Sequence, residues 1–212
     1  MRLLLNDRCS AMPWDAIDNV VFDVGNVLLA YQPEKVLRQL LPDREADYPL
    51  LMRHVFQSPY WHMLDHGTVS PEEAFMLMGS SKPALRPLIQ RISEGWNDLL
   101  DPIDEGIEAL RACKEHGKHC YVLSNYADEP FERSFQKHQA IFSLFDGVVV
   151  SARERLIKPD HRIYDLLIDR YRLDPERTLF IDDSSANVEA ALSCGWQAIH
   201  FCAPGVLRAF IR

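Results

Sequence analysis

Short apolar runs rich in β-branched residues alternate with helix-length segments along most of this chain. The segments between the later runs carry apolar residues at three- and four-residue spacings, as at Ile163, Leu166 and Leu167, which is the pattern of an amphipathic helix. Strands that alternate with helices predict an α/β fold with a parallel sheet covered by helices on both faces. The strands are expected at residues 19–23, 119–124, 147–151, 178–182 and 198–201.

One long interval, between the first expected strand and the second, breaks this alternation. Most of it has the spacing of helices, with Pro33 near its start and Asp101-Pro102 at its end. We therefore predict an α/β core formed by residues 1–31 and 103–212, and an inserted helical cap formed by residues 32–102. The helices of the cap are expected at residues 34–41, 46–57, 71–78 and 84–100.

Composition and charge argue against several classes of protein. Of the 212 residues, 47% are hydrophobic, which is enough for one substantial core. The net charge is −8 and no block of Lys or Arg forms a basic stripe, so we expect no nucleic-acid surface. The five cysteines are widely spaced without a C-x-x-C motif, and no long apolar run is present. Free thiols, no membrane association and a cytoplasmic location are therefore expected.

Polar residues stand at or shortly after the ends of four of the expected strands. Ligands of open α/β sheets bind outside the carboxyl ends of the strands, so these residues form the candidate site. The fold would gather them at one edge of the sheet although they are far apart in the sequence. They are Asp23, Ser124 with Asn125, Lys158, and Asp182 with Asp183.

The segments that carry these residues are FDVGNVLL, VLSN, LIKPDHRIY and FIDDSSANVEAAL, in this order. They resemble the four motifs of the haloacid dehalogenase-like (HAD) hydrolase superfamily, and the first has the FDxGNV form of a branch that includes sugar-phosphate phosphatases. The resemblance spans residues 19–202 and implies a Rossmann-like core with a helical cap. Each motif alone has a structural alternative, such as a turn at Asp23 or a solvated surface position for Lys158. The four in order favour the hydrolase.

The resemblance implies a role for each of these residues. Asp23 is the nucleophile, since a carboxylate can attack phosphorus and form an aspartyl-phosphate. Ser124 and Asn125 bind substrate by holding a phosphoryl oxygen. Lys158 keeps Asp23 ionised and neutralises charge on the phosphoryl group.

The adjacent carboxylates of Asp182 and Asp183 indicate a metal site. Two acids after a buried strand are unfavourable unless a positive charge compensates them, and a helix cap accounts well for only one. Mg²⁺ prefers oxygen ligands and typically takes one or two carboxylates with phosphate oxygens and water. By resemblance, Asp23 and Asp182 are direct ligands together with the backbone carbonyl of Gly25, while Asp183 orients Lys158 or a metal-bound water.

Gly25 departs from the family pattern. Most HAD phosphatases carry a second aspartate two residues after the nucleophile, which protonates the leaving oxygen and then activates water. Glycine can do neither, so an activated substrate, another residue or a metal-bound water must compensate. An aspartate introduced here would be strained if the turn needs a positive φ at this position.

The segment WHMLDHG, residues 61–67, concentrates candidates for the missing group in the cap. We expect it to connect two helices and to fold over the site. Trp61 and His62 would bind the substrate there, and His62, Asp65 or His66 would supply the proton. The alternative is a packed tryptophan beside two surface histidines.

The sequence thus predicts a Mg²⁺-dependent hydrolase of a small phosphorylated metabolite, acting on a phosphomonoester through an aspartyl-phosphate. The resemblance suggests glucose-1-phosphate or a similar sugar phosphate, because an anomeric phosphate leaves easily and would tolerate Gly25. Two alternatives stay open: a metal-independent 2-haloacid dehalogenase, whose halide needs no acid, and a catalytically idle HAD-fold binding protein. The Asp182-Asp183 pair argues against the first, and the retention of Asp23 and Lys158 against the second.

Overall fold

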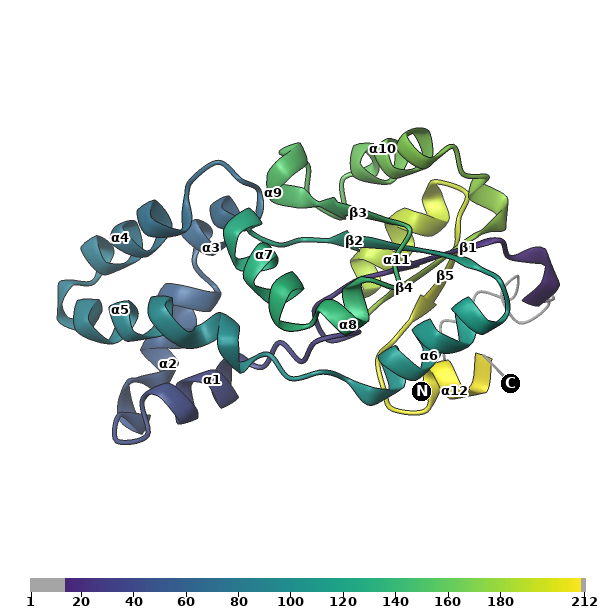
Figure 1. Cartoon of the computed structure of the whole chain (residues 1–212). Coiled ribbons are helices and arrows are strands. Elements are labelled where there is room, and N and C mark those ends of the chain that lie inside the picture. The colour runs from purple at the N-terminus through teal and green to yellow at the C-terminus, as the bar shows by residue number, and fades with distance from the viewer. Residues whose placement is uncertain (1–13, 211–212) are drawn as a thin grey trace.

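The computed structural model describes residues 14–210, and its centre is a five-stranded parallel sheet (Figure 1). The strand order is β3-β2-β1-β4-β5, so β1 lies in the middle and pairs with β2 and β4. The predicted α/β fold is confirmed, and each expected strand is present with ends that differ by at most one residue. The strands are β1 (Asn19–Phe22), β2 (His119–Ser124), β3 (Gly147–Val150), β4 (Thr178–Asp182) and β5 (Gln197–His200).

Helices cover both faces of the sheet because successive strand residues point to opposite sides. In β1, Val20 and Phe22 pack into one buried cluster and Val21 into the other. The first face carries α6 (Asp104–Glu115), α7 (Asp128–Lys137), α8 (Gln139–Phe142) and α12 (Val206–Phe210), and the second carries α10 (His161–Tyr171) and α11 (Ser185–Ser193).

The chain between β1 and β2 forms helices that stand to one side of the sheet, at the left in Figure 1. Two of the long helices expected here are broken into shorter pieces. Pro49, Pro83 and Pro87 each occupy the first turn of a new piece, because proline cannot continue a helix but fits its start. The pieces are α1 (Pro33–Leu40), η3 (Glu45–Asp47), α2 (Tyr48–Leu51), the π-helical η4 (Met52–Phe56), α3 (Pro59–Asp65), α4 (Pro71–Ser81), η5 (Pro83–Leu85), α5 (Arg86–Gly95) and η6 (Trp96–Leu99).

No helix within residues 14–210 is both long enough and apolar enough to cross a lipid bilayer.

The expected connection over residues 61–67 is wrong, because most of this segment belongs to α3. Ser58 begins the helix: its hydroxyl accepts a hydrogen bond from the N–H of Trp61 at 3.2 Å, and Pro59 fills the first turn. Trp61 and Asp65 are four residues apart and therefore share one face of α3. His62 is rotated from Trp61 by about 100° and points elsewhere.

The loop after β1 rests directly on α6 at Gly106. A Cβ atom at Gly106 would lie 1.9 Å from the carbonyl oxygen of Val27, so the backbone would have to shift. We expect Gly106→Ala to lower the free energy of unfolding by about 1–3 kcal/mol. Gly25→Ala is the matched control, because a Cβ there would meet only the Cβ of Tyr31 at 3.9 Å. Urea unfolding of both variants checks this, and a Gly106→Ala variant as stable as the wild type would contradict it.

Candidate active site

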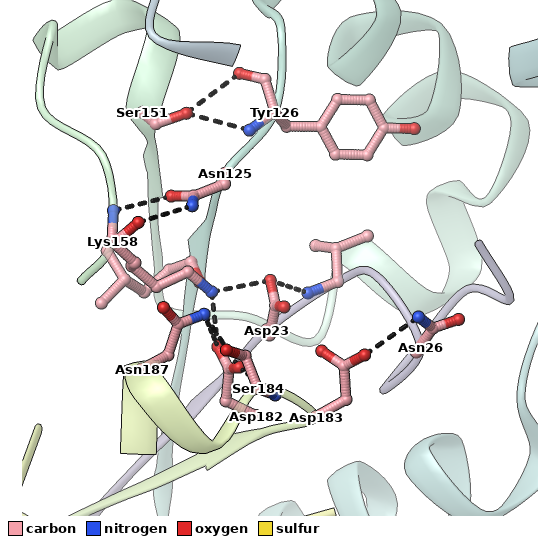
Figure 2. A network of polar contacts seen from close by, with 12 residues as sticks. Asp23, Asn26, Asn125, Tyr126, Ser151, Lys158, Asp182, Asp183, Ser184 and Asn187 are labelled. Atoms are coloured by element: carbon pink, nitrogen blue, oxygen red, sulfur yellow. Dashed lines mark hydrogen bonds and ion pairs between the residues drawn. The ribbon is translucent and has the colours of Figure 1, made fainter. Parts of the chain in front are cut away.

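Asp23 follows the last residue of β1, at the carboxyl edge of the sheet, and its side chain is largely buried. Its backbone N–H donates to the carbonyl of Ile181 at 2.9 Å, which continues the pairing of β1 with β4. Its Oδ1 accepts hydrogen bonds from the N–H of Val24 at 2.7 Å and from Nζ of Lys158 at 2.9 Å (Figure 2). These donors fix the carboxylate in one orientation.

Lys158 connects the first and last motifs. Its side chain is only 1% exposed, and Nζ donates to Asp23, to Oδ2 of Asp182 at 2.6 Å and to the carbonyl of Leu123 at 2.9 Å. Asn125 holds the lysine's backbone, accepting from its N–H at 2.8 Å and donating to its carbonyl at 3.0 Å. Burial lowers the pKa of Lys158, but the two carboxylates outweigh it and raise the pKa above the usual value. The ammonium therefore stays charged.

The two adjacent acids of the last motif, Asp182 and Asp183, have different hydrogen-bond partners. Asp182 is fully buried, and besides Lys158 it accepts from the N–H of Ser184 at 2.8 Å and from Nδ2 of Asn187 at 3.0 and 3.2 Å. Asp183 instead accepts from Nδ2 of Asn26 at 2.9 Å, and burial raises the pKa of its carboxyl. Figure 2 shows both acids beside Asp23.

The three acids fit a divalent cation. Asp23, Asp182 and Asp183 each offer a carboxylate oxygen within 4.8 Å of the other two. When all three acids are ionised, their charge exceeds that of the single ammonium of Lys158 by two. Burial raises the pKa of Asp23 to about 7, and the two other acids add to this rise while Lys158 opposes it. A doubly charged ion with oxygen ligands, such as Mg²⁺, would balance these charges.

A cavity of about 220 Å³ lies over Asp23, between the carboxyl edge of the sheet and the helices that connect β1 to β2. Its floor carries the charged and amide side chains. Its remaining wall is mostly aromatic, and α3 contributes the acidic side chain of Asp65 to it. The floor residues include Asp23, Gly25, Asn26, Asn125, Lys158, Asp183 and Asn187, and the wall includes Leu29, Tyr31, Trp61, Asp65, Trp96, Leu100 and Tyr126.

Asp65 is tied to the core through its backbone. Its carbonyl accepts a hydrogen bond from Oγ of Ser151 at 2.5 Å, and this hydroxyl accepts from the N–H of Tyr126 at 2.9 Å. Ser151 begins α9 (Ser151–Glu154), directly after β3. Burial raises the pKa of Asp65 well above its usual value, and the charge of Asp23 adds to the rise.

The structure brings most of the predicted residues together, but His62, His66 and Ser124 do not line the cavity. His62 is exposed on α3 and does not line the cavity, because the helix turns it away from the face that carries Trp61. Ser124, the last residue of β2, is 1% exposed and lies beneath the cavity rather than in its lining. Asp182 is likewise covered, but it contacts Lys158 directly.

Sequence reasoning missed Tyr31, Trp96, Tyr126 and Ser151. Tyr126 stands one residue beyond a predicted strand-end residue, so its position was a usable signal. Ser151 had the same signal, since it follows β3 directly. Tyr31 and Trp96 had none, because their place in the site depends on how the helices between β1 and β2 pack against the sheet.

Comparison with known proteins agrees with this geometry. Residues 17–195 match the family model of haloacid dehalogenase-like hydrolases. A sesquiterpene phosphatase from Aspergillus oryzae is 26% identical over 180 residues, which cover 85% of this chain and 87% of that protein. A D-ribitol-5-phosphate phosphatase from Bacteroides thetaiotaomicron is 23% identical over 190 residues, covering 85% and 90%.

Solved structures share the fold. A HAD family enzyme from Bacteroides thetaiotaomicron, in complex with magnesium and inorganic phosphate, superposes with a TM-score of 0.76 at 19% identity. The superposition covers 92% of this chain and all of that one. Because the family model covers most of the sequence, this chain belongs to the haloacid dehalogenase-like hydrolases.

Proposed function

We propose that the protein is a Mg²⁺-dependent phosphatase that hydrolyses small phosphomonoesters through an aspartyl-phosphate on Asp23. The observation that carries the proposal is Lys158, a buried ammonium that bridges Asp23 and Asp182 at the floor of a cavity. Both relatives named above are phosphatases, which supports the same reaction. Their substrates, a polyol phosphate and a sesquiterpene, differ too much in chemistry to choose this protein's substrate, and the expected sugar phosphate stays a prediction.

The first half of the reaction moves the phosphoryl group to the protein. A carboxylate oxygen of Asp23 forms a bond to phosphorus, and the bond from phosphorus to the ester oxygen breaks with its electron pair on that oxygen. Lys158 and Val24 hold the carboxylate, and Lys158 offsets negative charge on the phosphoryl oxygens. Mg²⁺, with Asp23, Asp182 and the backbone carbonyl of Gly25 as its expected ligands and Asp183 beside them, would add Lewis-acid stabilisation of the same charge.

The ester oxygen leaves as an alkoxide and needs a proton, which Gly25 cannot give. We assign this proton to Asp65. It lines the same cavity as Asp23, its raised pKa keeps a proton available, and Ser151 fixes its backbone above the site. In the second half, water attacks phosphorus, Asp65 takes its proton, and inorganic phosphate leaves as the Asp23 carboxylate is restored.

Phosphate release with and without Mg²⁺ tests the proposal. We expect the purified protein to hydrolyse acetyl phosphate and p-nitrophenyl phosphate in Mg²⁺, and excess EDTA to reduce the rate to background. Restoring free Mg²⁺ should recover it. Chloride release from 2-chloropropionate that survives EDTA would support the dehalogenase instead. No turnover of any of these compounds would support the idle binding protein.

A further inference from the structure

The wall of the active-site cavity is an almost continuous aromatic surface. Tyr31, Trp61, Trp96 and Tyr126, which we call the aromatic wall, come from four separate parts of the chain. The rings of Trp61 and Trp96 are 5.0 Å apart between centroids, Tyr31 lies 6.0 Å from Trp61, and Tyr126 is stacked 6.3 Å from Trp96. These are the spacings of interacting aromatic side chains. The wall is therefore packed and preformed.

One hydroxyl of this wall is already paired within the protein. The hydroxyl of Tyr126 donates to Oδ1 of Asn97 at 2.7 Å and lies 3.0 Å from Oγ of Ser134. The hydroxyls of a bound polyol would lose their hydrogen bonds to water and face aromatic rings instead. Each buried hydroxyl left without a hydrogen bond weakens binding by about 1–3 kcal/mol.

The amides at the floor of the cavity are engaged as well. Asn125 bonds to the backbone of Lys158, Asn26 to Asp183 and Asn187 to Asp182. The cavity thus has a charged end suited to a phosphoryl group and an apolar end suited to what the phosphoryl group is attached to.

We propose that the substrate is the phosphate ester of an apolar alcohol, an aryl-bearing or short branched hydrocarbon, rather than of a sugar or another polyol. This inference rests on the proposed phosphatase function and names its substrate class. The size of the cavity limits the hydrocarbon. About 220 Å³ is less than the roughly 300–1,000 Å³ of pockets for drug-sized ligands, whereas a cavity of about 150 Å³ holds benzene. Phosphate with one ring or a branched chain of similar size fits.

Phosphates with matched leaving groups test this inference. Benzyl phosphate, 3-methylbutyl phosphate, glycerol 1-phosphate and glucose 6-phosphate all release a primary alkoxide, so differences in kcat/KM report recognition. We expect the two apolar esters to be preferred by at least about 10-fold, since one or two well-buried methylenes are worth that much. Benzylphosphonate should likewise inhibit acetyl phosphate turnover more strongly than 2-hydroxyethylphosphonate, which separates binding from chemistry.

Trp96→Leu probes the wall itself, because leucine keeps the site apolar but removes the ring. We expect it to lower kcat/KM for benzyl phosphate by about 10-fold or more, and to lower kcat/KM for acetyl phosphate, which has no ring to bind, by a smaller factor. Phe135→Leu is the matched control: Phe135 packs on Phe142 outside the cavity, so its loss tests reduced packing alone. If Trp96→Leu does not fold, the comparison of kcat/KM between apolar and polyol esters in the wild type still tests the substrate class.

The outcomes separate the inference from the function on which it rests. Acetyl phosphate turnover with equal or better use of glycerol or glucose phosphate would overturn the apolar substrate class and leave the phosphatase intact. No Mg²⁺-dependent turnover of acetyl phosphate or of any ester would overturn both.

Discussion

Asp23→Asn is expected to reduce phosphate release by about 10⁴-fold or more, the scale on which removing a catalytic nucleophile acts in other hydrolases. An amide oxygen is a poor nucleophile and cannot form the aspartyl-phosphate. Its Oδ1 can still accept the hydrogen bonds that Val24 and Lys158 give to the carboxylate. The variant should therefore stay folded, and the lost activity is chemical rather than structural.

Thermal unfolding without Mg²⁺ supplies the structural readout for this variant. Burial and the neighbouring acids raise the pKa of Asp23 to about 7, so the fold disfavours its ionised form. Asparagine removes that charge, and the melting temperature should not fall. Mg²⁺ should stabilise the wild type more than Asp23→Asn, since a ligand stabilises the state that binds it. Asp165→Asn makes the same change at an exposed position of α10 and should behave like the wild type. Near wild-type turnover in Asp23→Asn would rule out the nucleophile.

The core half of the site could be predicted because its residues follow strands. Asp23, Asn125 and Asp182 sit at or next to the last residue of β1, β2 and β4, and parallel strands bring their carboxyl ends to one edge. Lys158 was harder, since it lies in a loop beyond α9, and the motif rather than the strand pattern pointed to it.

The cap half could not be placed from the sequence, because tertiary contacts decide it. Asp65 reaches the cavity only because Ser151 holds its carbonyl and Gly67 packs against Ala152, where a Cβ would come 2.2 Å from the carbonyl oxygen. No local sequence pattern predicts this close contact between Gly67 and Ala152. Both Trp61 and His62 were expected to bind the substrate, but the start of α3 at Ser58-Pro59 turns only Trp61 toward the cavity.

The turn at Gly25 does not need a positive φ at that residue, so the strain considered for a substitution there does not arise. The left-handed residue of this turn is Asn26, with φ of 53°, and Gly25 does not have a positive φ. Asn26 can hold that conformation because its side chain is bonded on both sides, to Asp183 and to the N–H of Tyr31. A Cβ atom at Gly25 therefore meets neither backbone strain nor a close neighbour, which makes Gly25→Asp a usable experiment.

Asp65→Asn should lower kcat/KM for alkyl phosphates by about 10²–10⁴-fold, the usual contribution of a general acid–base group. The kcat/KM for acetyl phosphate, whose leaving group needs no proton, should be nearly unaffected, whereas kcat should fall for every substrate because Asp65 also takes the proton of water in the second half. The rate with alkyl phosphates in the wild type should fall as the pH rises through the raised pKa of Asp65, because the acid must be protonated. Asp23, Tyr31 and Tyr126 are the titratable groups that face it. His62→Ala is the control, since His62 is exposed on the same helix.

Gly25→Asp in the Asp65→Asn background completes this test. It places a carboxylate two residues after the nucleophile, where a Cβ meets only the Cβ of Tyr31 at 3.9 Å. If a missing acid is the cause of the loss, the double variant should regain alkyl phosphate turnover by at least about 10-fold, within the range of general acid catalysis. A purely structural defect at Asp65 would not be rescued by a group on another segment. An Asp65→Asn variant whose kcat/KM stays flat across phosphates of graded leaving-group pKa would instead show that Asp65 is not the acid.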